Sequence, residues 1–368
     1  MRIVFWSELF WPVRGGAEIF GAKLISSLQD RGYEFAVITS NTSDLPNEDQ
    51  YNGVPIYRFP FREALGGAGI GLFTQLRSQV LKTRQKFNPD LAFINGISPN
   101  TIFCLMANGV QPSRVIVRVN QEILCGETAG KSTITGKALS TADWVACVST
   151  PLLAQTRRLV PEISNRSSVI MNGLELPEVT PEPLRFEDPI LLCLGRLVWQ
   201  KGFDLALAAL ASLCNRFPKV RLVVAGDGPE RATMERQAAA LGLANRVEFR
   251  GWVASEDIFN LINTATAVLM PSRLEGLPTV ALQAGIMARP VVATSVGGLS
   301  DIVVHRQTGL LIPPEDPARL SEAIVFLLEH PEAAVEMGQA IRERVRDMFS
   351  WQQCVDAYDT LFQQVAAA

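Results

Sequence analysis

The sequence predicts an α/β fold of two Rossmann-like domains that face a central cleft. Strand-like and helix-like runs alternate along all 368 residues, as they do in doubly wound parallel sheets. A chain of this length is too long for one ordinary hydrophobic core. The alternation also restarts after a proline-rich stretch, 177–189, which predicts a linker between the two halves.

The first half begins with a strand at 2–6, followed by a helix at 17–31 with Phe20, Leu24 and Leu28 on one face. Further strands are expected at 34–39, 91–94, 115–119, 144–148 and 168–171. Several of these runs are almost wholly apolar, which is typical of strands that helices cover on both faces.

The second half repeats the pattern. Strands are expected at 190–194, 220–225, 247–249, 267–270, 290–293 and 309–312, and helices at 202–217, 230–241 and 351–364. We therefore expect an N-terminal domain at 1–176, a linker at 177–189 and a C-terminal domain at 190–350. The amphipathic helix in 351–368 is expected to pack on one of the two domains, with the N-terminal one preferred.

Composition favours a globular, cytoplasmic protein. Apolar residues make up 48% and charged residues 19%, and the net charge of −3 argues against nucleic acid as a partner. The run before Ser7-Glu8 is too short for a signal peptide, and the longest uncharged stretch, 91–113, is broken by Asn and Pro. Six scattered cysteines without a C-x-x-C pair, and only two histidines, predict neither disulfides nor a histidine-rich metal site.

One helix suggests a membrane contact. Residues 64–89 contain no acidic residue, and the helix at 72–87 carries Arg77, Lys82, Arg84 and Lys86 beside apolar residues. A basic amphipathic helix can dock on anionic lipid, which would place the protein peripherally at the inner face of the membrane. The alternative is a core-packed helix with a solvated basic face.

Two strand ends in the second half carry the chemistry. After the strand at 190–194, Gly195-Arg196-Leu197-Val198-Trp199-Gln200-Lys201-Gly202 places two cations five residues apart on one loop. Such cations repel each other unless an anion joins them, and a diphosphate would do so. Two solvated surface charges are the alternative.

The second strand end reads Pro271-Ser272-Arg273-Leu274-Glu275-Gly276-Leu277-Pro278-Thr279-Val280. A helix opened by Pro278 would present free backbone N–H groups and a positive dipole end to an anion. Glu275 lies at the edge of this site and Gln283 eight residues on. Acceptors on both sides of a bound phosphate suit a nucleotide sugar.

Glycines mark two further strand ends. Gly226 and Gly228 after 220–225 indicate close approach of the backbone to a ligand or to a neighbouring loop, and Gly15-Gly16 indicate the same at a helix start, unless they form a plain turn. Residues 126–133 look like a phosphate-binding P-loop but have three residues between the glycines instead of four, so we do not expect ATP there.

Together these motifs resemble the retaining GT-B-fold glycosyltransferases of family 4, also called glycosyl transferases group 1. The resemblance spans nearly the whole chain and is specific for fold and family but hardly for substrate. The motifs that carry it are Gly15-Gly16, 171–175, Gly195-Arg196 with Lys201-Gly202, 225–229, 271–276, 290–294 and Gly297-Gly298.

The resemblance implies a role for each matching residue. Arg196 and Lys201 bind the donor diphosphate and stabilise its charge as the sugar leaves, and Glu275 accepts hydrogen bonds from the donor sugar. The donor is further expected to contact Gly15, Gly16, Gly195, Gly226, Val253, Gly276, Leu277, Thr279, Val280 and the residue at 283, Val253 at the base and 283 at the ribose. Because Arg and Lys supply the positive charge, no metal and no cofactor is expected, and the nucleotide sugar is a co-substrate.

The sequence departs from the family at two positions. Gln283 replaces the usual second Glu, and an amide binds ribose hydroxyls more weakly than a carboxylate does. The family often has His after the fifth strand, where this chain offers Arg118 or Asn120. We align Asn120 with that His and include it among the donor-binding residues.

The leading hypothesis is a metal-independent retaining hexosyltransferase that uses a UDP- or GDP-sugar. Its acceptor would be a saccharide, a lipid or a small molecule, which the sequence does not identify. The alternatives are a non-catalytic GT-B protein that senses a nucleotide sugar, or a GT-B epimerase or phosphorylase.

Overall fold

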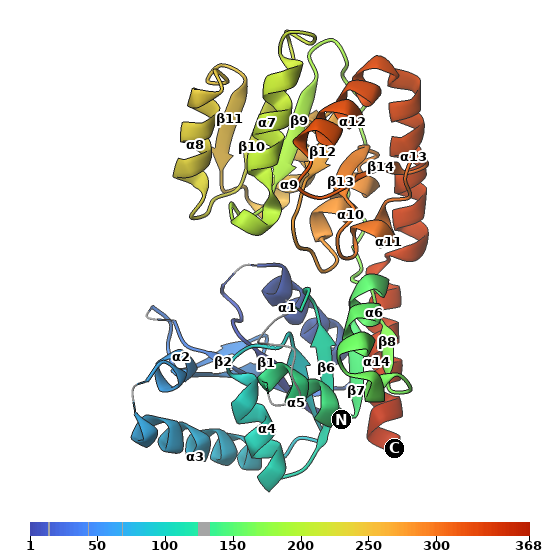
Figure 1. The fold of residues 1–368 in the computed structure, drawn as a ribbon. Coiled ribbons are helices and arrows are strands. Elements are labelled where there is room, and N and C mark those ends of the chain that lie inside the picture. The colour runs from blue at the N-terminus through green and yellow to red at the C-terminus, as the bar shows by residue number, and fades with distance from the viewer. Residues whose placement is uncertain (14, 43, 68, 124–132) are drawn as a thin grey trace. The chain divides into compact units, whose positions relative to one another are not determined.

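The computed structural model describes residues 1–13, 15–42, 44–67, 69–123 and 133–368. These residues form two compact α/β units (Figure 1). The first unit contains Met1–Met171 together with Gln352–Ala368, and the second contains Asn172–Trp351.

The described residues of the first unit form an eight-stranded sheet in the order β3-β4-β2-β1-β5-β6-β7-β8. Neighbouring strands are parallel except β3 and β4, which pair antiparallel at one edge. The strands are β1 (Arg2–Ser7), β2 (Glu34–Ser40), β3 (Glu48–Tyr51), β4 (Val54–Phe59), β5 (Leu91–Asn95), β6 (Arg114–Val119), β7 (Trp144–Cys147) and β8 (Ser167–Val169). The strand order reverses at β1, between β2 and β5, which is where ligands of doubly wound sheets bind.

Helices flank this sheet (Figure 1). They are α1 (Gly16–Gln29), α2 (Phe61–Leu65), α3 (Ile70–Phe87), α4 (Thr101–Val110), α5 (Ile134–Thr141), α6 (Thr150–Leu159), the short η1 (Pro161–Ile163) and, from the end of the chain, α14 (Trp351–Ala367). The strands β1, β2 and β5 are almost wholly buried, in agreement with their apolar sequences.

Two strands of the first sheet, β3 and β4, are absent from the sequence prediction. β3 has the sequence Glu48-Asp49-Gln50-Tyr51 and is the edge strand, so its side chains alternate between exposed and half-buried. Pro55 interrupts the β4 sequence. Polar residues and proline are typical of sheet edges and hide the apolar pattern that identifies a central strand.

The described residues of the second unit form a six-stranded parallel sheet in the order β11-β10-β9-β12-β13-β14. The strands are β9 (Ile190–Leu194), β10 (Arg221–Ala225), β11 (Val247–Gly251), β12 (Ala267–Met270), β13 (Val291–Thr294) and β14 (Gly309–Ile312). Here the order reverses at β9, between β10 and β12, so a ligand crevice is expected at the carboxyl ends of β9 and β12.

The helices of the second unit are η2 (Trp199–Lys201), α7 (Phe203–Leu213), α8 (Arg231–Ala240), η3 (Ser255–Asp257), α9 (Ile258–Thr264), α10 (Thr279–Ile286), α11 (Leu299–Ile302), α12 (Pro317–Glu329) and α13 (Pro331–Met348). One core cluster joins Leu191 of β9, Leu210 of α7 and Ile324 of α12, all fully or almost fully buried. The strand ends that carry the predicted site are thus fixed to a continuous apolar core.

The proline-rich segment 177–189 belongs to the second unit. Asn263 donates to the Thr180 carbonyl and accepts from the Glu182 N–H. The fully buried Arg289 donates to the carbonyls of Glu182 and Ala265 and to Asn263 Oδ1. Burial lowers the pKa of Arg289 to about 10. Side chains of the second unit therefore hold this segment by its backbone.

Helix α14 begins with Trp351, the last residue of the second unit, and its other residues belong to the first unit. Its Tyr358 and Phe362 are fully buried and meet the ring of Phe93 in β5 at centroid distances of 5.6 Å and 5.3 Å. Arg31 forms an ion pair with Asp359 at 2.7 Å. Residues from the end of the chain thus complete the core of the first unit.

The predicted basic face of the helix at 72–87 needs one correction. Arg84 is fully buried in α3, where its guanidinium donates to Asn108 Oδ1, the Gln111 carbonyl and Ser113 Oγ. Burial lowers the pKa of Arg84. Arg77, Lys82 and Lys86 are exposed. Among the described residues, no helix is both long and apolar enough to cross a bilayer.

Candidate active site

Two adjacent loops of the second unit carry most of the predicted site residues. The loop after β9 contains Arg196 and Lys201, and the loop after β12 contains Glu275. Because β9 and β12 are parallel neighbours, both loops leave the same edge of the sheet. The fold thus joins two sequence motifs that lie 74 residues apart.

Lys201 and Glu275 form an ion pair. Lys201 Nζ lies 2.7 Å from Glu275 Oε1, and the exposed fractions of the two side chains are 26% and 6%. Ser272 Oγ donates to the same oxygen at 2.7 Å. Glu275 Oε2 has no hydrogen-bond partner among the described residues. Lys201 and Ser272 therefore fix the carboxylate through Oε1 and leave Oε2 to accept from a ligand.

Close backbone contact explains the glycine that follows Lys201. Gly202 has φ +63°, and a Cβ atom there would lie 2.0 Å from the Pro271 carbonyl oxygen. Only glycine combines this left-handed conformation with such an approach. The two loops are therefore in direct contact beside the Lys201–Glu275 pair.

Arg196 is exposed, and within the described residues the structure gives its side chain no ion pair or hydrogen bond. It lies five residues before Lys201 on the same loop. A solvated guanidinium can still turn toward a phosphate and bind it through two N–H groups. The structure thus gives Lys201 a fixed partner and leaves Arg196 available.

The start of α10 differs from the prediction in one detail. The helix runs from Thr279 to Ile286, so Pro278 precedes it, with φ −74° and ψ 122°, instead of forming its first residue. Neighbouring groups hold the backbone just before it: the Gly298 N–H donates to the Gly276 carbonyl, and Asn172 Nδ2 donates to the Leu277 carbonyl. The Ala281 N–H donates to the Pro278 carbonyl, which leaves the N–H groups of Thr279 and Val280 to bind an anion.

Other expected donor residues lie on nearby segments. Thr279, Val280 and Gln283 are half-buried in α10. A Cβ atom at Gly226 would lie 1.8 Å from the Gly195 carbonyl oxygen, so contact with the neighbouring loop explains this glycine. Val253 is half-buried two residues beyond β11.

The remaining expected donor residues belong to the first unit. Gly15 precedes α1 and Gly16 begins it, and the space around the Gly16 Cβ position is open. Asn120 follows β6 directly and packs over Gly96. The structure thus places these residues at the carboxyl ends of β1 and β6, where a doubly wound sheet binds ligands.

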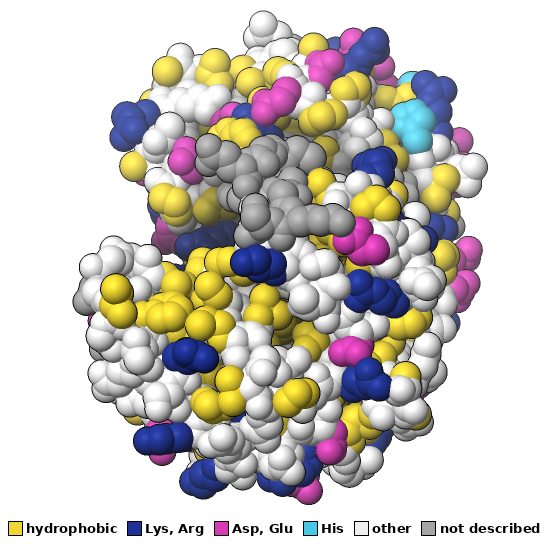
Figure 2. All heavy atoms as spheres, turned by 60° about the horizontal axis from the view of Figure 1, so that its bottom comes forward, with side chains coloured by type: hydrophobic (Ala, Val, Ile, Leu, Met, Phe, Trp, Pro, Cys, Tyr) yellow, Lys and Arg dark blue, Asp and Glu magenta, His cyan; other side chains and the backbone are white. Residues whose placement is uncertain are grey.

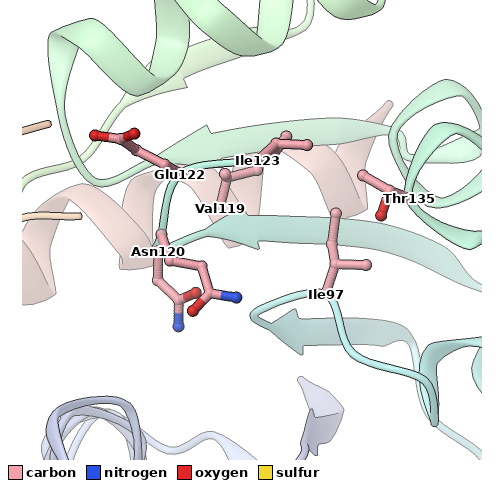
Figure 3. Close-up of a pocket in the computed structure, with 7 residues that line it drawn as sticks. Ile97, Val119, Asn120, Glu122, Ile123 and Thr135 are labelled. Atoms are coloured by element: carbon pink, nitrogen blue, oxygen red, sulfur yellow. The ribbon is translucent and has the colours of Figure 1, made fainter. Parts of the chain in front are cut away.

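Asn120 lines a pocket of about 200 Å³ in the first unit (Figure 3). Its lining consists of Ile97, Val119, Asn120, Gln121, Glu122, Ile123 and Thr135. Figure 3 shows Glu122 and Thr135 on opposite sides of this pocket. Gln155 holds one wall, because its side-chain amide exchanges two hydrogen bonds with the backbone of Ile123.

Arg118, the other residue considered for the family's histidine position, is 1% exposed. It donates to Asn95 Oδ1 at 2.7 Å and lies 3.7 Å above the ring of Phe20. The pKa of Arg118 is lowered, because the effect of burial outweighs that of Tyr358 in α14, which raises the pKa. Arg118 is therefore part of the core beneath α14, whereas Asn120 faces a pocket.

Two features bear on cofactors. The P-loop-like run 126–133 lies outside the described residues except for Thr133, whose hydroxyl caps α5 by accepting from the Gly136 N–H. Within the described part of the chain, no group of three or more His, Cys, Asp or Glu side chains could hold a metal ion.

The sequence prediction missed Ser272 and Arg273. Ser272 is 1% exposed and donates to Glu275, and Arg273 is linked to both loops of the site. In the sequence they are marked by their place in the stretch 271–276, which carries the resemblance and contains the predicted carboxylate. Their partners become visible only once the strands are paired.

Comparison with known proteins finds glycosyltransferases. Residues 179–344 match the family of glycosyl transferases group 1. The gpi3 subunit of the phosphatidylinositol N-acetylglucosaminyltransferase of Schizosaccharomyces pombe is 26% identical over 98% of this chain and 80% of its own length. The alpha-D-kanosaminyltransferase of Streptomyces kanamyceticus is 35% identical, over 41% of this chain and 39% of its own length.

Solved structures share the fold over the full chain. Sucrose-phosphate synthase from Thermosynechococcus elongatus superposes with a TM-score of 0.87 at 23% identity, covering 100% of this chain and 99% of its own. The Anabaena protein HepE in complex with UDP gives a TM-score of 0.81 at 20% identity, covering 99% and 100%. The fold is that of the GT-B glycosyltransferases, and the relatives found by sequence are glycosyltransferases. The match to the glycosyl transferases group 1 covers residues 179–344, which lie in the second unit.

Proposed function

We propose that this glycosyltransferase moves a hexosyl group from a nucleotide-diphosphate sugar to a hydroxyl group of an acceptor, with retention of configuration and without a metal. The single observation that carries the proposal is the contact of Lys201 with Glu275, 2.7 Å apart beside the start of α10. A cation, a carboxylate with one open oxygen and a helix N-terminus are the groups that a sugar diphosphate needs.

Each group has one task. Lys201 and Arg196 stabilise the negative charge that develops on the diphosphate as the bond between sugar C1 and the phosphate oxygen breaks. The N–H groups at the start of α10 hold the phosphate, and Glu275 Oε2 accepts from a sugar hydroxyl. The acceptor oxygen forms the new bond to C1, and its proton passes to the departing phosphate oxygen. The products are the glycoside and the nucleoside diphosphate, and no protein base is needed.

The relatives suggest which donor to test first. One is named for phosphatidylinositol and N-acetylglucosamine, and another protein of this fold was solved with UDP. We therefore propose a UDP-sugar as the donor, with GDP-sugars as the comparison. Gln283 is proposed to contact the ribose and Val253 the base.

Asn120 stays proposed as a donor-binding residue, and the pocket that it borders is proposed to bind the acceptor. Asn120, Gln121 and Thr135 give it amide and hydroxyl groups, and its described lining contains no Lys or Arg. Such a lining suits the hydroxyl groups of a saccharide or cyclitol better than a phosphate. Thr135→Val should then raise the KM for the acceptor several-fold and leave the KM for the donor unchanged, as initial-rate kinetics would measure.

A peripheral membrane contact is proposed at the start of α3. Ile70 is 85% exposed there, and Lys82 and Lys86 are exposed on the same helix. On the face that Figure 2 shows, hydrophobic side chains gather in places and the described Lys and Arg side chains are mostly scattered. The contact should therefore be weak and reversible. Co-sedimentation with phosphatidylglycerol vesicles should fall for Ile70→Ser, whereas binding that is equal for both proteins would contradict it.

The central test uses purified protein with UDP-N-acetylglucosamine, UDP-glucose or GDP-mannose, and phosphatidylinositol vesicles or alkyl glycosides as acceptors. Product is identified by mass spectrometry and nucleotide release is measured in parallel. Lys201→Gln keeps a hydrogen-bond donor for Glu275 but removes the charge, so transfer should fall by about 100-fold or more. Lys219→Gln is the matched control, because Lys219 is an exposed lysine of the same unit.

Transfer by the wild-type and Lys219→Gln proteins together with loss in Lys201→Gln would support the proposal. Full activity of Lys201→Gln would overturn the role of the cation. Nucleotide binding without turnover, for every donor and acceptor tested, would overturn the proposed transfer reaction.

A further inference from the structure

Arg273 lies two residues before Glu275 and is joined to three segments of the second unit. Its guanidinium binds both carboxylate oxygens of Asp204, each at 2.8 Å, and both oxygens of Glu315, at 2.5 Å and 3.2 Å. It also donates to the Trp199 carbonyl at 2.8 Å and lies 5.0 Å from the centre of the Trp199 ring. This arginine therefore binds two carboxylates, a carbonyl and an aromatic face at once.

The position of these partners relative to Lys201 is the informative feature. Trp199 precedes Lys201 by two residues and Asp204 follows it by three. A backbone hydrogen bond also joins the two loops, since the Arg273 N–H donates to the Gln200 carbonyl at 2.7 Å. Arg273 thus holds the segment that carries Lys201 on both sides of Lys201 itself.

The cluster differs from the solvated ion pairs elsewhere on this unit. The Arg273 side chain is 9% exposed, and those of its partners Asp204 and Glu315 are 41% and 56% exposed. In the pair of Arg319 and Glu322 both side chains are more exposed, at 62% and 64%. Bidentate geometry and low exposure make an arginine–carboxylate contact stronger and more specific in geometry. The hydrogen bonds from Arg273 to Asp204 raise the pKa of Arg273, and those to Glu315 add to the effect. A lysine would keep the charge but lose the planar fork that reaches both carboxylates.

We infer that Arg273 is a positioning residue that sets the distance between Lys201 and Glu275 by clamping their two loops through Asp204 and the Trp199 carbonyl, while Glu315 holds its guanidinium from a third segment. The inference rests on the proposed function of that pair. Arg273 acts through Lys201 and Glu275 and itself takes no part in the chemistry. Because the diphosphate and the sugar hydroxyls are held by different loops, a looser clamp lets the two halves of the site move independently.

The first test is kinetic. Arg273→Lys and Asp204→Asn should each lower kcat about 10- to 100-fold, with the donor KM changed less than about 3-fold, because orientation is lost and binding groups are kept. Since both changes open the same clamp, the double variant should be no slower than the slower single variant. Arg319→Lys is the matched control and should keep wild-type kcat.

A merely structural role gives another pattern. It would lower thermal stability while the kcat of the folded fraction stayed at the wild-type value. That result, or losses of the two single variants that multiply in the double variant, would overturn the inference.

The second test needs no activity. Crystal structures of Arg273→Lys and Asp204→Asn should show the Lys201–Glu275 contact lengthened beyond hydrogen-bond distance, whereas an unchanged 2.7 Å contact would overturn the inference. Asp204→Asn keeps the local shape and serves if Arg273→Lys does not fold. Failure of the wild-type protein to transfer any sugar would refute the proposed function, and the crystal structures would still decide on the clamp.

Discussion

Lys201 Nζ and Glu275 Oε1 lie 2.7 Å apart although 74 residues separate them in the chain. The pairing of β9 with β12 brings their loops to one edge of the sheet, and Gly202 lets the loops touch. The lysine is therefore held in place by the same carboxylate that offers a second oxygen to a ligand. One ion pair thus orients both a cation for phosphate and an acceptor for sugar hydroxyls.

Glu275→Gln should lower the rate of sugar transfer by about 100-fold or more, because a neutral amide holds Lys201 less firmly and accepts hydrogen bonds less strongly. Initial-rate measurements of product formation check this. Glu248→Gln, an exposed carboxylate of the same unit paired with Arg250, is the control and should be fully active. A rate within about threefold of wild type for Glu275→Gln would contradict the role of the charge.

Gly202→Ala should destabilise the protein more than Gly242→Ala. Both glycines have positive φ, +63° and +71°, so both substitutions cost about 1–2 kcal/mol of backbone strain. Only at Gly202 would the new Cβ also meet a carbonyl oxygen, at 2.0 Å, whereas nothing lies within 4 Å at Gly242. Free energies of unfolding from urea titrations measure the difference. Equal losses would show that the two loops do not press on Gly202.

Gln283→Glu should lower the KM for the nucleotide sugar about three- to tenfold, because a carboxylate makes stronger hydrogen bonds to ribose hydroxyls than an amide does. The gain should vanish for a donor whose ribose lacks both hydroxyls, which makes that analogue the control. An equal gain for both donors would show that the residue at 283 acts elsewhere in the site.

The contact between Asp359 and Arg31 should make the stability of the first unit depend on pH. Burial alone raises the pKa of Asp359, but hydrogen bonds from Tyr33 and Arg31 outweigh it, so the pKa in the folded state is below its usual value. The stabilisation is therefore complete above about pH 4, the range of an unfolded Asp, and is lost as the pH falls through the lower pKa of the folded state.

Thermal unfolding of wild type and Asp359→Asn checks this prediction. The wild-type protein should unfold at the higher temperature at pH 7, and the two midpoints should converge near pH 2. Asp44→Asn, which changes an exposed carboxylate, is the control and should leave the midpoint unchanged at both pH values. A gap between wild type and Asp359→Asn that persists at pH 2 would show that shape, not charge, explains the effect.

The sequence identifies central strands well because burial on both faces requires a continuous run of apolar residues. β12, for instance, is four apolar residues that are all buried. The edge strand β3 lacks that mark, since its side chains face solvent or are half-buried. The sequence pattern also misplaces Arg84. The helical pattern alone puts this cation at the surface, but hydrogen-bond partners on and after α4 allow it to be buried.

The candidate site likewise has residues that the sequence predicts and residues that it does not. Arg196, Lys201 and Glu275 stand out because they follow strands and are flanked by glycines, which are local signals. The clamp around Arg273 depends on Asp204 and Glu315, from two other segments of the chain. Contacts between distant segments depend on strand order, which the local pattern of residues does not encode.

Helix α14 has a consequence for how the chain reaches its folded state. Tyr358 and Phe362 fill the core of the first unit, yet the ribosome makes them only after the whole second unit. During synthesis, part of the apolar surface of the first unit, including the ring of Phe93, therefore stays exposed until α14 has been made. The second unit, continuous in sequence, can finish first, so the half of the molecule that is translated first completes its fold last.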